Sequence, residues 1–520
     1  MAERAAVEPL NGDVSDRMLY DPVTYRGGDG SWHRDFLEAV RHTAGPLTWD
    51  PGAVHSILSY GYPCGDSTLF REIKRKPWLS QVRSDGEAHL LEIPRHGRRA
   101  CSAEVIAENL DRLLEEEIVQ AATGHDKVMV LLSGGLDSRI VAGVAARALR
   151  KGRITVPVIG VTWGMANCRD VAYGQSTARV LGLEWIHVDL HPADLIANIE
   201  LAAADLGGLS SPVHIHRMGW FEHAGPNTLV LAGSYGDSIG RAEFSSKHLL
   251  ELRPLTTGSA GGLMTPEALA EGAMAFGQDL AQLRQRAKGE PRYVICDLEM
   301  QGHYMRGMIS HVMDVINRYC TLYQAFTHPS VYEYVWSIHP SMRTDQPYAA
   351  LLERLGKDLA ALPWARTNRA VKGPTRGALP GLGKKFHAYE KWISGELFDR
   401  LREELDIPWL ASTGLFNRKA IEKLLEVVRQ GKGQPMPSYL LVWLISLQRV
   451  WRRIIDKGVT IEPFRPTMAA PPPKPARCGR LRNRLVRMPF LVRAVQALHR
   501  LKRPMVRRRA LREFPPEQES

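Results

Sequence analysis

Short apolar runs alternate with amphipathic segments through the middle of the chain. The run Val128-Met129-Val130-Leu131-Leu132 is continuous, as expected for a strand that is buried on both faces of a parallel sheet. Similar apolar runs cover residues 154–161, 185–188 and 228–231. Between these runs, helical patterns cover residues 103–121, 136–150 and 170–181. This alternation of strand and helix predicts an open α/β sheet.

The regions on either side of this α/β segment have different patterns. Residues 1–100 combine short strands with turns rich in Gly and Pro, whereas the chain after Met264 is mostly helical. Helical spacing of apolar residues there covers 305–315, 393–401, 420–428 and 439–455. A proline-rich stretch then precedes a basic tail. We therefore predict three parts, at residues 1–100, 101–465 and 466–520.

The bulk composition is that of an ordinary globular protein. Apolar residues make up 44% and charged residues 24% of the 520 positions, and no apolar run reaches the roughly 18 residues of a membrane-spanning helix. The six cysteines form no CxxC pair, which disfavours a zinc ribbon or a disulfide framework. The first ten residues lack the apolar stretch of a signal peptide. We expect a cytoplasmic protein.

The net charge of +12 is concentrated at the carboxyl end of the chain. Residues 471–520 contain 14 Lys and Arg against three Glu, so the rest of the chain is nearly neutral. A solvated tail, contact with an anionic membrane surface or an acidic partner, and binding to RNA all fit this mixture of Arg with Leu and Val. Peripheral contact with the membrane is therefore one expectation among three.

The strongest chemical signal is Ser133-Gly134-Gly135-Leu136-Asp137-Ser138, which lies between a predicted strand and a predicted helix. The two glycines allow a sharp turn and a close approach of the backbone to a ligand. Loop amides and the helix N-terminus favour an anion, the serine hydroxyls can donate to phosphate oxygens, and Asp137 can hold magnesium. The loop is not a Walker loop, because no GxxxxGK[ST] is present. A purely structural turn is the alternative.

This loop resembles the pyrophosphate loop of the ATP pyrophosphatases, which cleave ATP between its α and β phosphates. Three further stretches are similar to the synthetase domain of asparagine synthetase. They are Trp163-Gly164 with Arg169-Asp170, the segment from Leu231 to Ser238, and Thr327-His328-Pro329 with Lys384-Lys385-Phe386. The resemblance implies an open parallel sheet of the adenine-nucleotide alpha-hydrolase (ATP pyrophosphatase) type, with a helical C-terminal part and a small degenerate N-terminal domain.

The resemblance also implies an activity and a set of site residues. The family adenylates a carboxylate, releases pyrophosphate and couples the acyl group to ammonia or an amine, with ATP and Mg2+. Asp137 and Asp237 would hold magnesium, and Lys384, with Lys385 or Lys372 as substitutes, would stabilise charge at the α-phosphorus. The implied ATP-binding residues are Leu132, Ser133, Gly134, Gly135, Leu136, Asp137, Ser138, Val161, Gly233, Ser234 and Tyr235.

Two departures from the family pattern bear on the substrates. Glutamine-hydrolysing members begin with a nucleophilic cysteine, whereas the first cysteine here is Cys64, so we expect ammonia from a separate glutaminase or an amine on the substrate. Ser234 and Ser238 stand where the family has two glutamates, which argues against asparagine itself as the product. Tyr235, polarised by Glu243, is a candidate proton acceptor, with a packing role as the alternative.

Three other functions stay open from the sequence. One is a tailoring ligase, such as a peptide macrolactam (lasso) cyclase acting on a precursor peptide, or a β-lactam-type synthetase. Another is a tRNA-modifying adenylating enzyme guided by the basic tail, which the missing cysteine pair disfavours for sulfur transfer. The third is a pseudoenzyme that binds ATP or a partner protein without catalysis.

Overall fold

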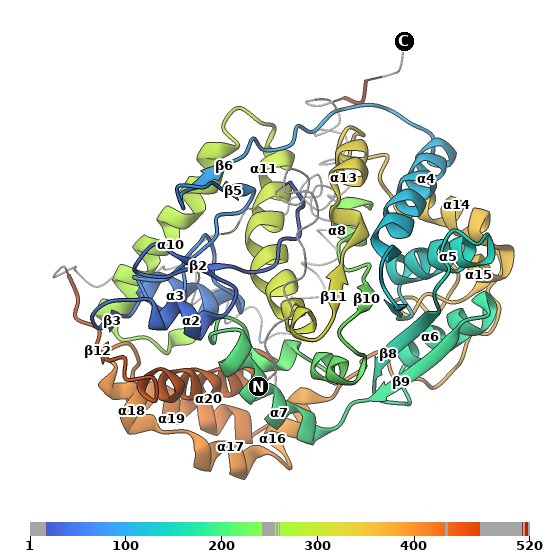
Figure 1. Cartoon of the computed structure of the whole chain (residues 1–520). Helices are drawn as coiled ribbons and strands as arrows, with labels where there is room; N and C mark the ends of the chain where they lie inside the picture. Colours follow the sequence, from blue (N-terminus) through green and yellow to red (C-terminus); the bar gives the residue numbers. More distant parts are fainter. Residues whose placement is uncertain are drawn as a thin grey trace.

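A computed structural model describes residues 17–241, 255, 258, 260–431, 435–467, 512 and 515–517. Figure 1 shows an α/β region on the right, the N-terminal segments on the left and the last helices of the body below them. Glu243 and almost all of the basic tail lie outside the described residues. Among the described helices, none has the length and apolar character needed to cross a membrane.

The central sheet has five strands, and every neighbouring pair is parallel. The strands are β7 (Lys127–Leu131), β8 (Val158–Gly164), β9 (Glu184–Asp189), β10 (Thr228–Leu231) and β11 (Thr321–Tyr323). Their spatial order is β11-β10-β7-β8-β9. Successive crossovers therefore run in one direction from β7 to β9 and then reverse at β10, which opens a crevice at the carboxyl ends of β7 and β10. The predicted α/β fold is confirmed.

Helices cover one face of this sheet, because their apolar stripes alternate with polar residues at helical spacing. They are α4 (Ala103–Ala122), α5 (Leu136–Arg150) and α6 (Arg169–Leu181). A further helix, α14 (Asp345–Leu355), packs against α4 and α5, and all four lie on the right of Figure 1. The fully buried strand residues Val128, Val130 and Leu231 explain the continuous apolar runs in the sequence. The second strand begins four residues later than predicted, after Pro157, since proline cannot donate to the ladder.

The chain after Met264 is mostly helical, as expected, but two predicted helices differ from the observed elements. Residues 393–401 do not form one helix, because the chain breaks at Gly395 between α16 (Tyr389–Ser394) and α17 (Phe398–Glu404). Residues 305–315 belong to a π-helix at Met300–Ser310, a short α12 (His311–Met313) and a 3-10 turn. The other long helices are α10 (Pro266–Arg286), α11 (Arg292–Glu299), α13 (Pro329–Trp336), α19 (Arg418–Arg429) and α20 (Pro435–Ile455).

The N-terminal segments share a hydrophobic core with the last helices. Tyr25, Phe36 and Trp49 belong to the same buried cluster as Trp443 and Phe464. A parallel pairing of β3 (Leu47–Thr48) with β12 (Ile461–Glu462) joins the two ends of the described body. The short elements in this region are β1 (Tyr25–Arg26), β2 (Trp32–His33), α2 (Phe36–Arg41), α3 (Pro51–Tyr60), β4 (Lys74–Arg75), β5 (Ser80–Val82) and β6 (Ala88–Leu90). The domain boundaries at 100 and 465 stay predictions.

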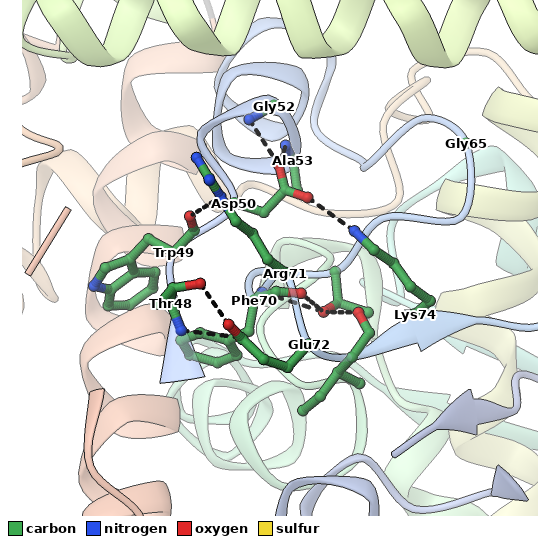
Figure 2. A network of polar contacts seen from close by, with 12 residues as sticks. Thr48, Trp49, Asp50, Gly52, Ala53, Gly65, Phe70, Arg71, Glu72 and Lys74 are labelled. Atoms are coloured by element: carbon green, nitrogen blue, oxygen red, sulfur yellow. Dashed lines mark hydrogen bonds and ion pairs between the residues drawn. The ribbon is translucent and has the colours of Figure 1, made fainter. Parts of the chain in front are cut away.

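Side-chain carboxylates hold these short strands in place (Figure 2). Asp50 caps α3 by accepting hydrogen bonds from the amides of Gly52 and Ala53, and it also pairs with Lys74 at 3.2 Å. Glu72 accepts a hydrogen bond of 2.9 Å from the amide of Thr48. Strands of two residues have few ladder bonds of their own, so these contacts fix their positions.

Candidate functional site

Two loops meet at the crevice where the strand order reverses. One follows β7 and contains Ser133 to Ser138, and the other follows β10 and contains Gly233 to Asp237. A Cβ atom on Gly233 would lie 2.8 Å from the carbonyl carbon of Asp137, and one on Gly236 would lie 2.5 Å from its Oδ1. Glycine is therefore required at both positions for the loops to touch. We call these residues, 133–138 and 233–237, the loop end.

Hydroxyl groups and backbone amides organise the first loop. Ser133 and Ser138 place their hydroxyls 3.0 Å apart, and the amides of Ser133 and Gly135 donate to these hydroxyl oxygens. The amide of Gly134 donates to Asp170 at 3.2 Å. Helix α5 begins at Leu136 without a side-chain cap, so its first amides remain available for an anion.

Asp137 has the charge environment of a ligand-binding carboxylate. Its Oδ2 pairs with Arg241 at 3.1 Å, whereas its Oδ1 is buried and has no hydrogen-bond partner among the described residues. Burial raises the pKa of Asp137, and the neighbouring Arg241 opposes this rise. Arg241 also pairs with Asp345 at 3.1 Å and lies over the rings of Tyr348 and Trp364. A carboxylate oxygen without a partner can bind magnesium, and the neighbouring amides can bind the phosphates that the magnesium accompanies.

The crevice is a cavity of about 410 Å³. Most of the residues predicted to bind ATP or magnesium line this cavity. They are Leu132, Ser133, Gly135, Asp137, Ser138, Val161, Gly233, Ser234 and Asp237. Gly134 and Leu136 lie beside the cavity without lining it, because Gly134 packs on Ala365 and Leu136 is fully buried. The structure thus brings nine predicted residues from three separate stretches to one place.

Another part of the cavity lining is aromatic and carries two histidines. His214 and His216 line it together with Trp163 and Phe386, and we call these four residues the histidine end. Burial lowers the pKa of His214 to about 4 and lowers that of His216 well below its usual value, so both imidazoles are neutral at pH 7. Nδ1 of His216 and the hydroxyl of Tyr389 form a hydrogen bond of 3.1 Å. These two histidines were not predicted from the sequence, although the His-x-His spacing shortly after Pro212 could have indicated them.

The comparison with known families identifies the segment that carries both loops. Residues 109–286 match the model of the asparagine synthase family. This segment is an asparagine synthase domain. A chicken (Gallus gallus) protein named asparagine synthetase [glutamine-hydrolyzing] is 29% identical over 97 residues, which cover 19% of this chain and 17% of that protein. The chain therefore spans less than a fifth of the length of this curated relative in the matched region.

The asparagine synthase domain contains the loop end and both histidines, but other cavity residues lie beyond it. Phe386 and the π-helix residue Met308 belong to later segments and still line the same cavity. Residues 383–386 are held against the domain by backbone hydrogen bonds, since Arg169 donates to Gly383 and Met165 donates to Phe386, each at 2.9 Å. The later helical part therefore completes the wall that the domain begins.

The three candidate lysines occupy different places relative to the domain. Lys384 is exposed between Gly383 and Phe386, and it forms no ion pair among the described residues. Lys385 pairs with Glu390 at 3.2 Å, and Lys372 pairs with Glu353 at 3.7 Å. None of these lysines lines the 410 Å³ cavity, but the segment of Lys384 reaches it through Phe386.

Tyr235 belongs to the loop end, but its side chain points away from the cavity into the protein interior. It is 1% exposed, its hydroxyl forms a hydrogen bond with Ser310, and it does not line the cavity. Burial raises its pKa, which keeps the phenol protonated. Because its predicted partner Glu243 lies outside the described residues, the role of proton acceptor stays a prediction that this geometry does not favour.

Proposed function

We propose that this chain is an ATP-dependent amide ligase, which adenylates a carboxylate, releases pyrophosphate and passes the acyl group to ammonia or an amine. The observation that supports this proposal is the buried, unpartnered Oδ1 of Asp137 beside the uncapped start of α5. A carboxylate oxygen that is kept from water without a hydrogen-bond partner is costly unless a ligand completes it. The asparagine synthase domain is the second support, because its matched residues include this loop.

Each part of the loop end has a role in this reaction. The α5 amides and the hydroxyls of Ser133 and Ser138 bind the β and γ phosphates and hold the triphosphate in line for displacement. Asp137 and Asp237 would hold magnesium, which neutralises the charge of the leaving pyrophosphate. Lys384, two residues before the cavity residue Phe386, is our choice for stabilising the charge at the α-phosphorus.

The histidine end bears on the choice of carboxylate. Two neutral imidazoles beside Trp163 and Phe386 make a wall without fixed charge, whereas a free amino acid would need charged partners for its amine and carboxylate. This observation favours a larger, less polar substrate and therefore the tailoring alternatives, a peptide macrolactam cyclase or a β-lactam-type synthetase, over asparagine supply. Ser234 at the cavity wall, in place of a family glutamate, points in the same direction.

Pyrophosphate exchange tests the proposal directly. The full chain with ATP and magnesium is offered a panel of free amino acids, aromatic acids and peptides with acidic side chains, and exchange of labelled pyrophosphate into ATP is measured. We expect exchange with at least one carboxylate and AMP as the final nucleotide product. Asp137→Asn should lower the exchange rate by at least about 100-fold. The control Asp126→Asn, at the exposed opposite end of β7, should leave it unchanged. Formation of ADP and phosphate would overturn the proposal.

The tRNA-modifying alternative rests on the basic tail, whose residues 468–511 lie outside the described part of the chain. The same pyrophosphate exchange assay, repeated with bulk tRNA added to the panel of carboxylates, distinguishes it from the amide-ligase proposal. Exchange that depends on tRNA and is insensitive to every free carboxylate would favour that alternative.

A further inference from the structure

A cluster of metal-ligating side chains lies in the N-terminal segments, apart from the cavity. Asp29, His33 and His42 each place one ligand atom so that all three lie within 4.8 Å of one another. Asp29 belongs to the turn after β1, His33 to β2, and His42 directly follows α2. None of the three lines the 410 Å³ cavity.

The main chain at these three positions is held in place without any contribution from the side chains of Asp29, His33 and His42. The amide of Asp29 donates to the carbonyl of His42 at 3.0 Å, which joins the turn to the end of α2. His33 is held in register opposite Tyr25 in the β1–β2 pair. Gly28 adds a further bond to the hydroxyl of Thr43 at 3.0 Å. The three side chains therefore start from a preorganised frame, which lowers the entropic cost of binding an ion.

The side chains already point toward one another. Oδ2 of Asp29 lies 2.9 Å from Nδ1 of His42, and the rings of His33 and His42 stack with their centroids 4.3 Å apart. The hydroxyl of Ser31 lies 2.6 Å from Nε2 of His33 and also donates to Oδ1 of Asp29 at 2.5 Å. Two hydrogen bonds from Ser31, through its amide and its hydroxyl, favour the ionised carboxylate.

We propose that Asp29, His33 and His42 bind one divalent transition-metal ion, with zinc as the best match and water as the fourth ligand. Two imidazoles and one carboxylate are a donor set typical of zinc, whereas magnesium and calcium prefer oxygen ligands throughout. Tetrahedral coordination needs donor atoms about 3.3 Å apart, so modest side-chain rotations close the observed cluster around an ion. Ser31 then supports the ligands from outside through the hydrogen bonds that it already makes.

The position of the site indicates what the ion does. It links the β1–β2 hairpin to α2, whose Phe36, Ala39 and Val40 are fully buried in the core shared with the last helices. An ion that binds only the folded arrangement stabilises it by mass action. Zinc therefore fastens the N-terminal segments to the body and is not needed for the chemistry in the cavity.

Zinc titration of the full chain tests this inference. Protein freed of metal with EDTA is titrated with Zn2+ by calorimetry, and thermal unfolding is followed with and without Zn2+. We expect one site of micromolar or tighter affinity and a rise in Tm. The double variant His33→Ala/His42→Ala should weaken this site at least 10-fold and abolish the rise. The matched control is His191→Ala/His223→Ala, since each of these exposed histidines faces one carboxylate at 3.4 Å. The control should bind zinc as the unchanged chain does.

Anomalous diffraction from crystals grown with Zn2+ locates the ion without any substitution. A peak between Asp29, His33 and His42 supports the inference, and a peak elsewhere identifies an adventitious ion only. Equal zinc affinity in the His33→Ala/His42→Ala variant and its control would also overturn it. Because the three residues are at most partly buried, the variants should keep the circular dichroism of the folded chain. Asp29→Asn, a milder change, should weaken binding in the same direction.

Discussion

The loop end and the histidine end of the cavity differ in what holds their side chains. At the loop end, Asp137 forms an ion pair with Arg241 and packs directly against Gly233 and Gly236 of the facing loop. At the histidine end, His214 and His216 are partly buried by segments far apart in the sequence and form no ion pair among the described residues. The first end therefore depends on charge pairing and close packing, and the second depends on the exclusion of water.

This difference separates what the chemistry needs from what the substrate needs. Phosphate binding requires amides, hydroxyls and acidic groups in a fixed arrangement, which strand ends and a helix N-terminus supply. A substrate wall requires only shape and polarity, and side chains from several elements can supply these. Variants that disturb charge or packing should therefore act most strongly at the loop end.

Removal of the cation at the loop end should have the largest effect on folding. Arg241→Gln leaves the mostly buried carboxylate of Asp137 without its cation, and we expect the free energy of unfolding at pH 7 to fall by about 3 kcal/mol, the lower end of the range for buried pairs. The control is Arg112→Gln, because Arg112 pairs with Glu116 on an exposed face of α4, where such a pair contributes less than about 0.5 kcal/mol. Urea unfolding measures both changes.

A double variant sharpens this prediction. Asp137→Asn together with Arg241→Gln removes both charges, so it should be more stable than Arg241→Gln alone. If Arg241→Gln and Arg112→Gln cost the same free energy, the loop end does not depend on charge pairing.

The variant Gly236→Ala, which adds a single methyl group, tests the contact between the two loops. In Gly236→Ala the new Cβ would lie 2.5 Å from Oδ1 of Asp137, so the loops must separate or the carboxylate must turn. We expect a loss of roughly 1–3 kcal/mol in unfolding free energy and at least about 10-fold weaker binding of ATP with magnesium. Calorimetry and urea unfolding measure the two effects.

The matched control for this variant is Gly277→Ala in α10. Nothing lies within 4 Å of a Cβ atom there, and alanine stabilises a helix by about 0.5–1 kcal/mol relative to glycine. Unchanged ATP binding in Gly236→Ala would show that the loops are not in functional contact.

Much of the loop end could be predicted from the sequence, because its determinants are local. The apolar run of β7, the two glycines and Asp137 stand next to one another, and the same short pattern predicts both the turn and its chemistry. The parallel sheet followed from the alternation of strands and helices. The three-residue β11 was not predicted, since a run of that length has no period to read.

The contacts between distant segments could not be predicted. Arg241 meets Asp137 across 104 residues, and Phe386 reaches the cavity from a segment that the sequence only suggested as a lysine loop. The π-helix at Met300–Ser310 has an ordinary apolar pattern, so its altered geometry comes from tertiary packing. The shared core of the N-terminal segments and the last helices likewise depends on long-range contacts.

The histidine end should show itself through the pH dependence of stability. The pKa of His214 is about 4 in the folded chain and about 6.5 when unfolded, so the unfolded state binds the proton first as the pH falls. Stability should therefore decrease from pH 6.5 to pH 4. We expect His214→Asn to remove roughly 1–2 kcal/mol of this decrease. The exposed His223→Asn should leave the slope unchanged. The free energy of unfolding, measured at several pH values, gives this slope for each protein. Equal slopes for the unchanged chain and His214→Asn would contradict the exclusion of water from His214.

The smallest effect on stability should come from Lys384, which is exposed and forms no ion pair among the described residues. Lys384→Ala should change the free energy of unfolding by less than about 0.5 kcal/mol. With the carboxylate identified by the exchange panel, the same variant should nevertheless lower pyrophosphate exchange at least about 100-fold, because charge at the α-phosphorus loses its cation. Lys372→Ala, which removes a lysine paired with Glu353, should leave the exchange rate intact. If the two variants exchanged pyrophosphate equally well, the cation would have to come from another residue, and Arg241, the partner of Asp137, would be the group to examine.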